Sequence, residues 1–136
     1  MIVLIDTNVI LDYVLLREPF AETAGKCLEQ IIIRKEKAYL TASTITDIYY
    51  VSRKALQNNE AAKSIISKLL NAFQIAAVDK PDCLKALNAD ISDYEDALVS
   101  VCAQKVKAEW IITRNTKHFQ NSSVPAILPD DFLKLL

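Results

Sequence analysis

Oxygen-bearing side chains suited to binding a divalent cation are spread over the whole chain, at Asp6, Asp47, Asp93, Asp96 and Asn115. Asp6 comes directly after the apolar run of residues 2–5, which is typical of a strand buried on both faces of a parallel sheet. Ligands of open α/β sheets collect at the carboxyl ends of strands, so an acid at this point is a candidate ligand. Two carboxylates about 4 Å apart repel by roughly 4 kcal/mol at an effective dielectric constant of 20. A cluster of three therefore needs a cation, and all-oxygen ligands favour Mg²⁺ or Mn²⁺.

Asp6 and Asp47 each have a structural alternative. Asp6 could serve only as the N-cap of a helix expected over residues 9–16. Asp47 lies one turn into a helix expected over residues 42–56, where Thr44 and Asp47 have the spacing of a capping arrangement. The pattern at these two positions leaves both readings open.

The stretch over residues 91–106 is predicted to be an apolar helix that opens with acids. Ser92 and Glu95 have the Ser-x-x-Glu spacing of a capping box, which assigns both to structure. Asp93 and Asp96 are three residues apart and project from one side of the first turn. Acids there could simply favour the helix dipole. Because two neighbouring carboxylates also repel, we interpret Asp96, and after it Asp93, as functional.

The elements that must position these residues alternate along the chain. Strands are predicted over residues 2–5, 38–41, 74–78 and 110–113, with an edge strand at Ala126. Helices are predicted over residues 9–16, 20–35, 42–56, 59–73 and 91–106, and after Pro81 and Pro129. This alternation predicts an α/β fold with a parallel sheet, in which polar residues at strand ends, such as Thr113 and Asn115, can converge on one edge. The length of 136 residues favours a single domain over residues 1–136.

Composition excludes several classes of protein. Lys and Arg number 16 against 17 Asp and Glu, so no general basic field indicates charge-driven binding of nucleic acid. The only glycine, Gly25, excludes glycine-rich phosphate loops, and the only histidine, His118, excludes sites built on paired histidines. Cys27, Cys83 and Cys102 are too far apart in sequence to indicate a zinc site. The first residues lack the charged start and cleavable apolar core of a signal peptide, and no apolar run approaches about 18 residues, so we expect a soluble, cytoplasmic protein that is not bound to a membrane.

Four blocks of the sequence resemble the PIN-domain ribonucleases, especially the small VapC-type toxins. They are residues 4–10 around the sequence Asp-Thr-Asn, an acid early in a middle helix at Asp47, residues 96–103, and residues 111–115. The resemblance covers nearly the whole chain. It implies a three-layer α/β/α fold with a parallel sheet of four or five strands. The implied activity is the metal-dependent cleavage of RNA phosphodiester bonds.

The resemblance also implies roles for individual residues. Asp6, Asp47 and Asp96 correspond to the metal-holding acids, Asn115 to a fourth acidic position, and Thr113 and Asn8 to supporting polar groups. The second acid is more often Glu, so Asp47 is one methylene shorter. The fourth is commonly Asp, so Asn115 removes a charge, and Asp93 is a candidate to supply the missing carboxylate to the Mg²⁺ or Mn²⁺ site.

The resemblance further implies partners: a single-stranded RNA substrate, a second copy of the chain in a homodimer, and an antitoxin whose peptide occupies the acidic groove. We expect phosphate contacts from Arg17, Arg53, Arg114 and Lys117. Two alternatives stay open. A haloacid-dehalogenase-like phosphatase also has an Asp at the end of its first strand, but it needs a second Asp where this chain has Asn8. A catalytically inactive PIN scaffold, whose acids only cap helices, is the other.

Overall fold

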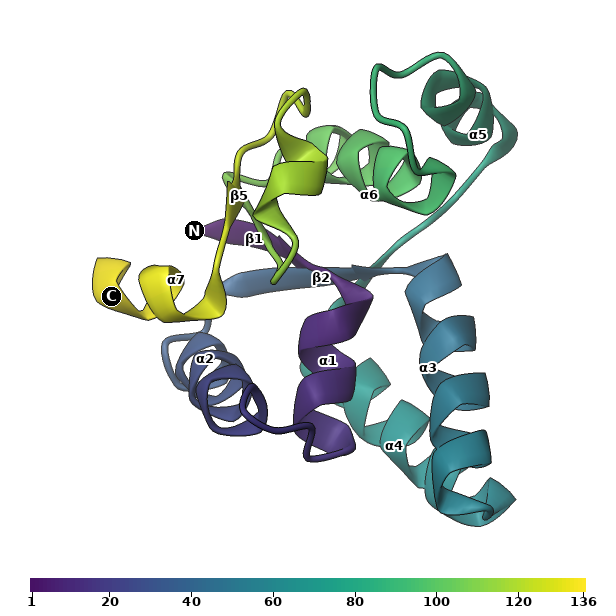
Figure 1. Cartoon of the computed structure of the whole chain (residues 1–136), viewed down its shortest axis with the longest axis vertical. Helices are drawn as coiled ribbons and strands as arrows, with labels where there is room; N and C mark the ends of the chain where they lie inside the picture. The colour runs from purple at the N-terminus through teal and green to yellow at the C-terminus, as the bar shows by residue number, and fades with distance from the viewer.

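The computed structural model describes all 136 residues, and its strands alternate with helices along the chain (Figure 1). The strands are β1 (Ile2–Ile5), β2 (Lys37–Thr41), β3 (Gln74–Ala76), β4 (Trp110–Ile112) and β5 (Ala126–Ile127). The helices are α1 (Thr7–Val14), α2 (Ala21–Ile33), α3 (Ala42–Leu56), α4 (Asn59–Ala72), α5 (Lys80–Leu87), α6 (Tyr94–Lys105), the short 3-10 helix η1 (Thr116–Phe119) and α7 (Pro129–Leu135).

The strands form one fully parallel sheet in the order β3-β2-β1-β4-β5, with β1 in the middle. From β1 the chain continues to β2 on one side, and later reaches β4 on the other side. The carboxyl ends of β1 and β4 are therefore a topological switch point, where α/β sheets bind ligands. The register pairs Ile5 with Ile112, and the backbone N–H of Asp6 donates to the carbonyl of Ile112 over 2.9 Å. Asp6 and Thr113, the next residue of each strand, thus meet at this edge.

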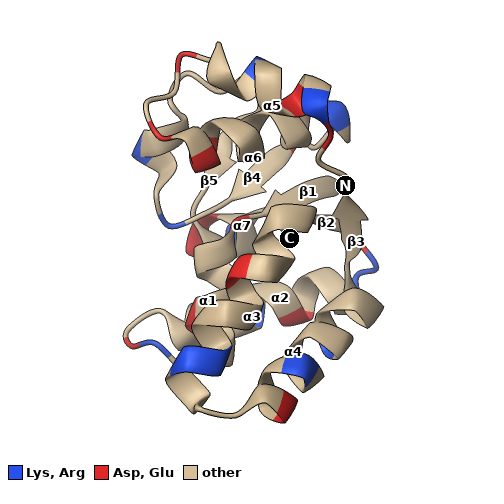
Figure 2. Cartoon of the chain, turned by 90° about the vertical axis from the view of Figure 1, so that its right-hand side faces the viewer, with Lys and Arg blue, Asp and Glu red and all other residues tan.

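Helices cover both faces of the sheet, which makes three layers (Figure 2). Val3 and Ile5 of β1 belong to a core formed with α1, α2, α3, α4 and α7. Leu4, which points to the opposite face, belongs to a second core formed with α6 and η1. All three side chains are fully buried, as expected for an apolar strand without polar alternation. The predicted three-layer α/β/α fold with a parallel sheet is confirmed, with five strands.

Helix α6, which covers the second face of the sheet, is anchored at its C-terminal end by an ion pair with a buried acid. Lys105, in the last turn of α6, places its ammonium 2.6 Å from the Asp82 carboxylate of α5 and 2.6 Å from the carbonyl of Ala77. Asp82 is 4% exposed and also accepts the N–H of Asp79. The hydrogen bond from Lys105 is the main reason that the pKa of Asp82 is lowered. This ion pair holds α5 against α6 and fixes the helix that carries Asp96.

The N-cap of α6 lies one residue after the position predicted from the sequence. We predicted a capping box of Ser92 and Glu95, but this prediction is wrong: the N-cap is Asp93, whose Oδ1 accepts the N–H of Asp96 over 2.9 Å. An ionised Asp is a strong cap because its charge also favours the positive end of the helix dipole. Glu95 is consequently released from the capping role.

None of the helices combines the length and apolar character needed to cross a membrane.

Candidate active site at the carboxyl end of β1

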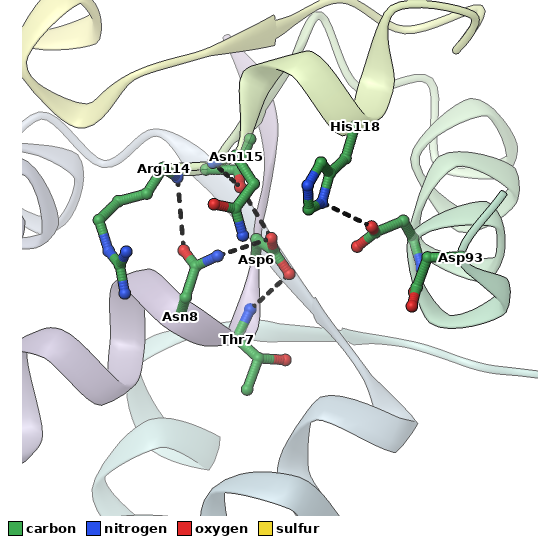
Figure 3. A network of polar contacts seen from close by, with 9 residues as sticks. Asp6, Thr7, Asn8, Asp93, Arg114, Asn115 and His118 are labelled. Atoms are coloured by element: carbon green, nitrogen blue, oxygen red, sulfur yellow. Dashed lines mark hydrogen bonds and ion pairs between the residues drawn. The ribbon is translucent and has the colours of Figure 1, made fainter. Parts of the chain in front are cut away.

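Asp6 is a buried acid held in one orientation at the edge of the sheet (Figure 3). It is the N-cap of α1, and its Oδ1 accepts the N–H of Thr7 over 2.8 Å. Its Oδ2 accepts from Asn8 Nδ2 over 3.1 Å and from Thr113 Oγ1 over 2.8 Å. A carboxylate has about four lone-pair sites, so one on Oδ1 stays free for a ligand. Asp6 is therefore both a cap and a candidate ligand, and the two readings of the sequence do not compete.

The environment of Asp6 disfavours its negative charge. The side chain is 6% exposed, and this burial is the main reason that its pKa is raised. Hydrogen bonds from Thr113 and Thr7 oppose the shift, and the charge of Asp96 adds to it. A carboxylate placed in this way is more stable when a cation is bound beside it.

The segment after β4 supplies neutral groups to the site. Thr113 is fully buried and its hydroxyl also accepts the N–H of Asn115 over 3.0 Å. The side chain of Asn115 lies beside Asp6 and Asn8 in Figure 3. The predicted convergence of Thr113 and Asn115 on Asp6 is therefore found, and Asn115 brings an amide to the place where the resemblance implies an acid.

A chain of hydroxyl groups fixes the start of α3, the helix that carries Asp47. Thr41 is the N-cap of α3 and accepts the N–H of Thr44, and the Thr44 hydroxyl lies 2.9 Å from the hydroxyl of Thr7 at the start of α1. The two helices that follow β1 and β2 are thus joined at the sheet edge. The alternative in which Thr44 and Asp47 form the cap is wrong, because Thr41 has that role. This leaves the half-buried Asp47 free of a capping duty.

The first turn of α6 brings further acids. Asp96 Oδ2 lies 3.1 Å from Nδ1 of His118 in η1. Burial and the charge of Asp93 raise the pKa of Asp96, while His118 opposes the shift. Asp93 is exposed and its Oδ1 is engaged in the cap of α6. Asp96 therefore contacts His118 and its charge acts on Asp6, whereas Asp93 serves as the N-cap of α6.

Glu95 is an acid beside the site that its sequence pattern had assigned to a helix cap. Its position is exposed, but partial desolvation of the carboxyl and a hydrogen bond with the Asp47 carboxyl raise its pKa to about 7. The charges of Asp6 and Asp93 contribute to the same shift. The sequence carried one usable signal: the run Asp93-Tyr94-Glu95-Asp96 holds more acids than a single cap requires.

The cluster as a whole is acidic, and its acids interact in pairs. The charge of Asp96 raises the pKa of Asp6, and the charges of Asp6 and Asp47 raise the pKa of Glu95. No three His, Cys, Asp or Glu side chains stand close enough together to bind one metal ion directly. A small hard cation such as Mg²⁺ needs only one or two carboxylates, since water fills its other positions. The carboxylate oxygens of Asp6, Glu95 and Asp96, whose pKa values are raised chiefly by burial, are ligands of the kind that such an ion prefers.

Two of the cations expected to contact phosphate have structural partners instead. Arg114 forms a two-pronged pair with the buried carboxylate of Asp12, over 2.5 and 3.1 Å, and its guanidinium stacks on the ring of Phe20 at 4.1 Å. Arg53 donates to the side chain of Asn59 over 2.7 Å at the turn between α3 and α4. Both guanidinium groups are engaged within the fold, so the expectation that they serve RNA is not supported.

The raised pKa of Glu95 predicts how the stability of the cation-free protein changes with pH. The ordinary pKa of a Glu side chain is 4.5, and in the folded protein that of Glu95 is about 7. Between these two pH values Glu95 is protonated in the folded protein but ionised in the unfolded chain, so its contribution to stability is lost as the pH rises. The Glu95→Gln variant has no such proton. Its free energy of unfolding in EDTA should therefore match that of the wild type near pH 4.5 and exceed it above pH 7. Urea unfolding at both pH values checks this, and a difference that does not change with pH would contradict it.

Comparison with solved structures gives the same fold. A chain in the structure of VapBC2 from Rickettsia felis, bound to a DNA fragment from its promoter, matches with a TM-score of 0.74, 15% identity, and coverage of 94% of this chain and 98% of that chain. A chain of a toxin-antitoxin complex from Klebsiella pneumoniae matches with a TM-score of 0.70 and 21% identity, and the match covers 93% of this chain and 97% of that chain. FitAcB from Neisseria gonorrhoeae matches with a TM-score of 0.67 and 21% identity, also over 93% and 97%.

No curated protein sequence matches this chain. The model of the PIN domain family, however, matches residues 2–117. This span runs from β1 into η1 and includes each acid described above. The resemblance inferred from the four sequence blocks is confirmed, and the chain belongs to the PIN domain family.

Proposed function

We propose that this protein is a divalent-cation-dependent endoribonuclease that hydrolyses phosphodiester bonds in single-stranded RNA. The observation that supports this most directly is that Asp6, at the carboxyl end of β1, and the acids Glu95 and Asp96 of α6 have raised pKa values, chiefly because of burial and secondly because of neighbouring acids. Membership of the PIN domain family supports the same conclusion. Asp6, Asp96 and Asp47 are the proposed metal-holding residues for Mg²⁺ or Mn²⁺, with one or two of them binding the ion directly and the others through its water molecules.

The bound ion would polarise the scissile phosphate and lower the pKa of a water molecule for in-line attack. The chain's own residues prepare the site for it. Thr7, Asn8 and Thr113 hold the Asp6 carboxylate in one orientation, so little side-chain entropy is lost when a ligand binds. The imidazole of His118 lies 3.1 Å from the Asp96 carboxylate and restrains that side chain. The phosphodiester backbone of single-stranded RNA is accessible, so it can reach a site at the edge of the sheet.

We further propose that the protein is the toxin of a toxin-antitoxin pair. Structurally similar chains come from VapBC and FitAB complexes, which contain an antitoxin. An apolar groove between α1, α2 and α4 fits the apolar face of a protein partner, and it is lined by Tyr13, Leu16, Ile32, Leu69 and Phe73 among others. Leu16 is 72% exposed and Ile32 is 51% exposed, which is unusual for large apolar side chains. The homodimer implied by the resemblance stays a prediction.

The two alternatives receive no comparable support. In a phosphatase of the haloacid dehalogenase type, a second acid would follow Asp6 by two residues, but here the amide of Asn8 donates to Asp6. In an inactive scaffold the acids would be caps, yet Asp47 and Glu95 cap no helix.

Incubation of the purified protein with a mixture of RNAs and Mn²⁺ tests the proposal. We expect internal cleavage that stops when EDTA is added and resumes when Mn²⁺ is restored in excess, because the acids alone provide no electrophile for the phosphate. Intact RNA under all conditions would favour the inactive scaffold. Release of inorganic phosphate from a phosphate monoester, without RNA cleavage, would favour the phosphatase.

A further inference from the structure

The hairpin of α3 and α4 is a locally basic part of a chain whose net charge is −1. The two helices pack side by side and extend away from the sheet, and α3 begins at the edge that carries the candidate site (Figure 1). Residues 42–72 contain four Lys and Arg against two Asp and Glu, whereas the rest of the chain contains 12 against 15. A polyanion that reaches the site therefore meets a favourable charge along this hairpin.

A hollow on the surface of this hairpin combines apolar side chains, two tyrosines and a cation. Its volume is about 350 Å³, and it is lined by Ile45, Thr46, Tyr49, Tyr50, Lys63 and Ile66. Small-molecule sites in proteins measure about 300–1,000 Å³, so the hollow has room for a planar ring such as a nucleobase.

Tyr50 presents an aromatic ring to solvent beside the candidate site. Its side chain is 62% exposed, and its ring lies against that of Tyr49 in an edge-to-face arrangement with the centroids 5.1 Å apart. This contact restrains the Tyr50 ring, so little side-chain freedom is lost when a planar group stacks on it. Tyr50 follows Asp47 by three residues on α3. The two side chains therefore project from the same side of the helix, about 4.5 Å apart along its axis.

Lys63 brings a positive charge to the hollow that no carboxylate of the chain neutralises. It is exposed and belongs to none of the ion pairs of the structure. The same is true of Lys54, which follows Tyr50 by one helical turn on α3. Both ammonium groups differ in this respect from Arg53 and Arg114, whose guanidinium groups are engaged within the fold.

We propose that Tyr50 and Lys63 form a subsite for one nucleotide of a single-stranded RNA, in which the base stacks on Tyr50 and Lys63 contacts a phosphate. The inference rests on the proposed function and names residues that position its substrate. Proteins bind unpaired bases on aromatic rings and the nucleic-acid backbone with cations. A second copy of the chain fits this surface less well, because a two-fold interface centred on the hollow would bring two Lys63 side chains together.

Binding of a fluorescent single-stranded RNA to the full chain in EDTA, measured by anisotropy, tests the inference without cleavage. We expect Tyr50→Ala to raise the Kd by about 5-fold to 100-fold, the range for losing one stacked base. Tyr50→Phe should keep the wild-type Kd, since the ring makes the stack. Leu70→Ala is the matched control and should also keep it, because Leu70 is an exposed apolar residue of α4 outside the hollow.

The salt dependence of the same Kd tests the phosphate contact. Each phosphate neutralised on a single strand contributes about 0.7 to the slope of log K against log salt concentration, so Lys63→Gln should lower the slope by this amount. Lys134→Gln on α7 removes an equally exposed ammonium and should leave the slope unchanged. Thermal unfolding in EDTA confirms that each variant is folded.

The outcomes separate this inference from the proposed function. If the wild type cleaves RNA and Tyr50→Ala binds it as tightly as the wild type, the subsite is wrong and the function stands. If Tyr50→Ala loses RNA binding but the wild type does not cleave, the subsite stands and the function is wrong. A wild-type dimer that dissociates in Tyr50→Ala with an unchanged Kd for RNA, seen by sedimentation, would make the hollow an interface between copies and overturn the inference.

Discussion

The Asp6→Asn variant is expected to lose Mn²⁺-dependent RNA cleavage by roughly 100-fold to 1,000-fold while keeping its fold. Asp6 is the most buried acid of the site, and an amide there removes a charged ligand from the proposed cation. Loss of several kcal/mol of transition-state stabilisation corresponds to this range, since each 1.36 kcal/mol is about tenfold in rate. The rate of cleavage of a fluorescent RNA by the variant and the wild type measures the effect. Asp96→Asn should act in the same direction.

The fold of Asp6→Asn should survive because Asn is also a good N-cap and its oxygen can accept the N–H of Thr7. Burial raises the pKa of Asp6, so removing its charge also relieves a desolvation cost in the cation-free protein. The matched control is Asp130→Asn in the exposed first turn of α7, which should cleave RNA at the wild-type rate. Undiminished cleavage by Asp6→Asn would mean that the catalytic centre lies elsewhere.

Arg114→Met should lower the free energy of unfolding by about 3 kcal/mol, out of the roughly 5–15 kcal/mol typical of folded domains. Asp12 is 1% exposed, and its carboxylate loses its only cationic partner in this variant. The expected loss is at the low end of the range for breaking a buried ion pair because the Arg114 side chain is 27% exposed. Urea unfolding gives the free energy directly.

The double variant Asp12→Leu with Arg114→Met is the control for this interpretation. Replacing both charges by apolar groups leaves no unpaired ion inside, so most of the lost stability should return. If Arg114→Met is as stable as the wild type, the ion pair does not hold the segment after β4 in place. The backbone N–H of Arg114 lies 3.4 Å from the side-chain oxygen of Asn8, so RNA cleavage should also be recorded for both variants.

Several features could be read from local sequence because they depend on neighbours within one turn or one strand. The apolar residues 2–5 and 110–112 form central strands of the sheet, and the acid that follows the first run lies at the switch point. Burial on both faces requires apolar residues at every strand position, so this pattern is visible without coordinates. The helix over residues 42–56 was predicted with the bounds that α3 has.

Other features involve contacts between residues far apart in sequence, and local patterns do not encode them. Ser92 and Asp93 both have the chemistry of a cap, and the packed position of α6 selects Asp93. The partner of Glu95 lies on α3, and the partner of Arg114 lies on α1. Arg114 forms its partly buried ion pair with Asp12 only because β4 lies beside β1, which α1 follows.

The sequence by itself determined the family, the parallel α/β fold and most of the acids of the candidate site, since these follow from residue types and their periodicity. The tertiary structure alone decided which acids are available to a ligand and which are committed to caps or ion pairs. The physical reason is that a carboxylate's role depends on its desolvation and its nearest charges, and both arise only when distant segments pack together.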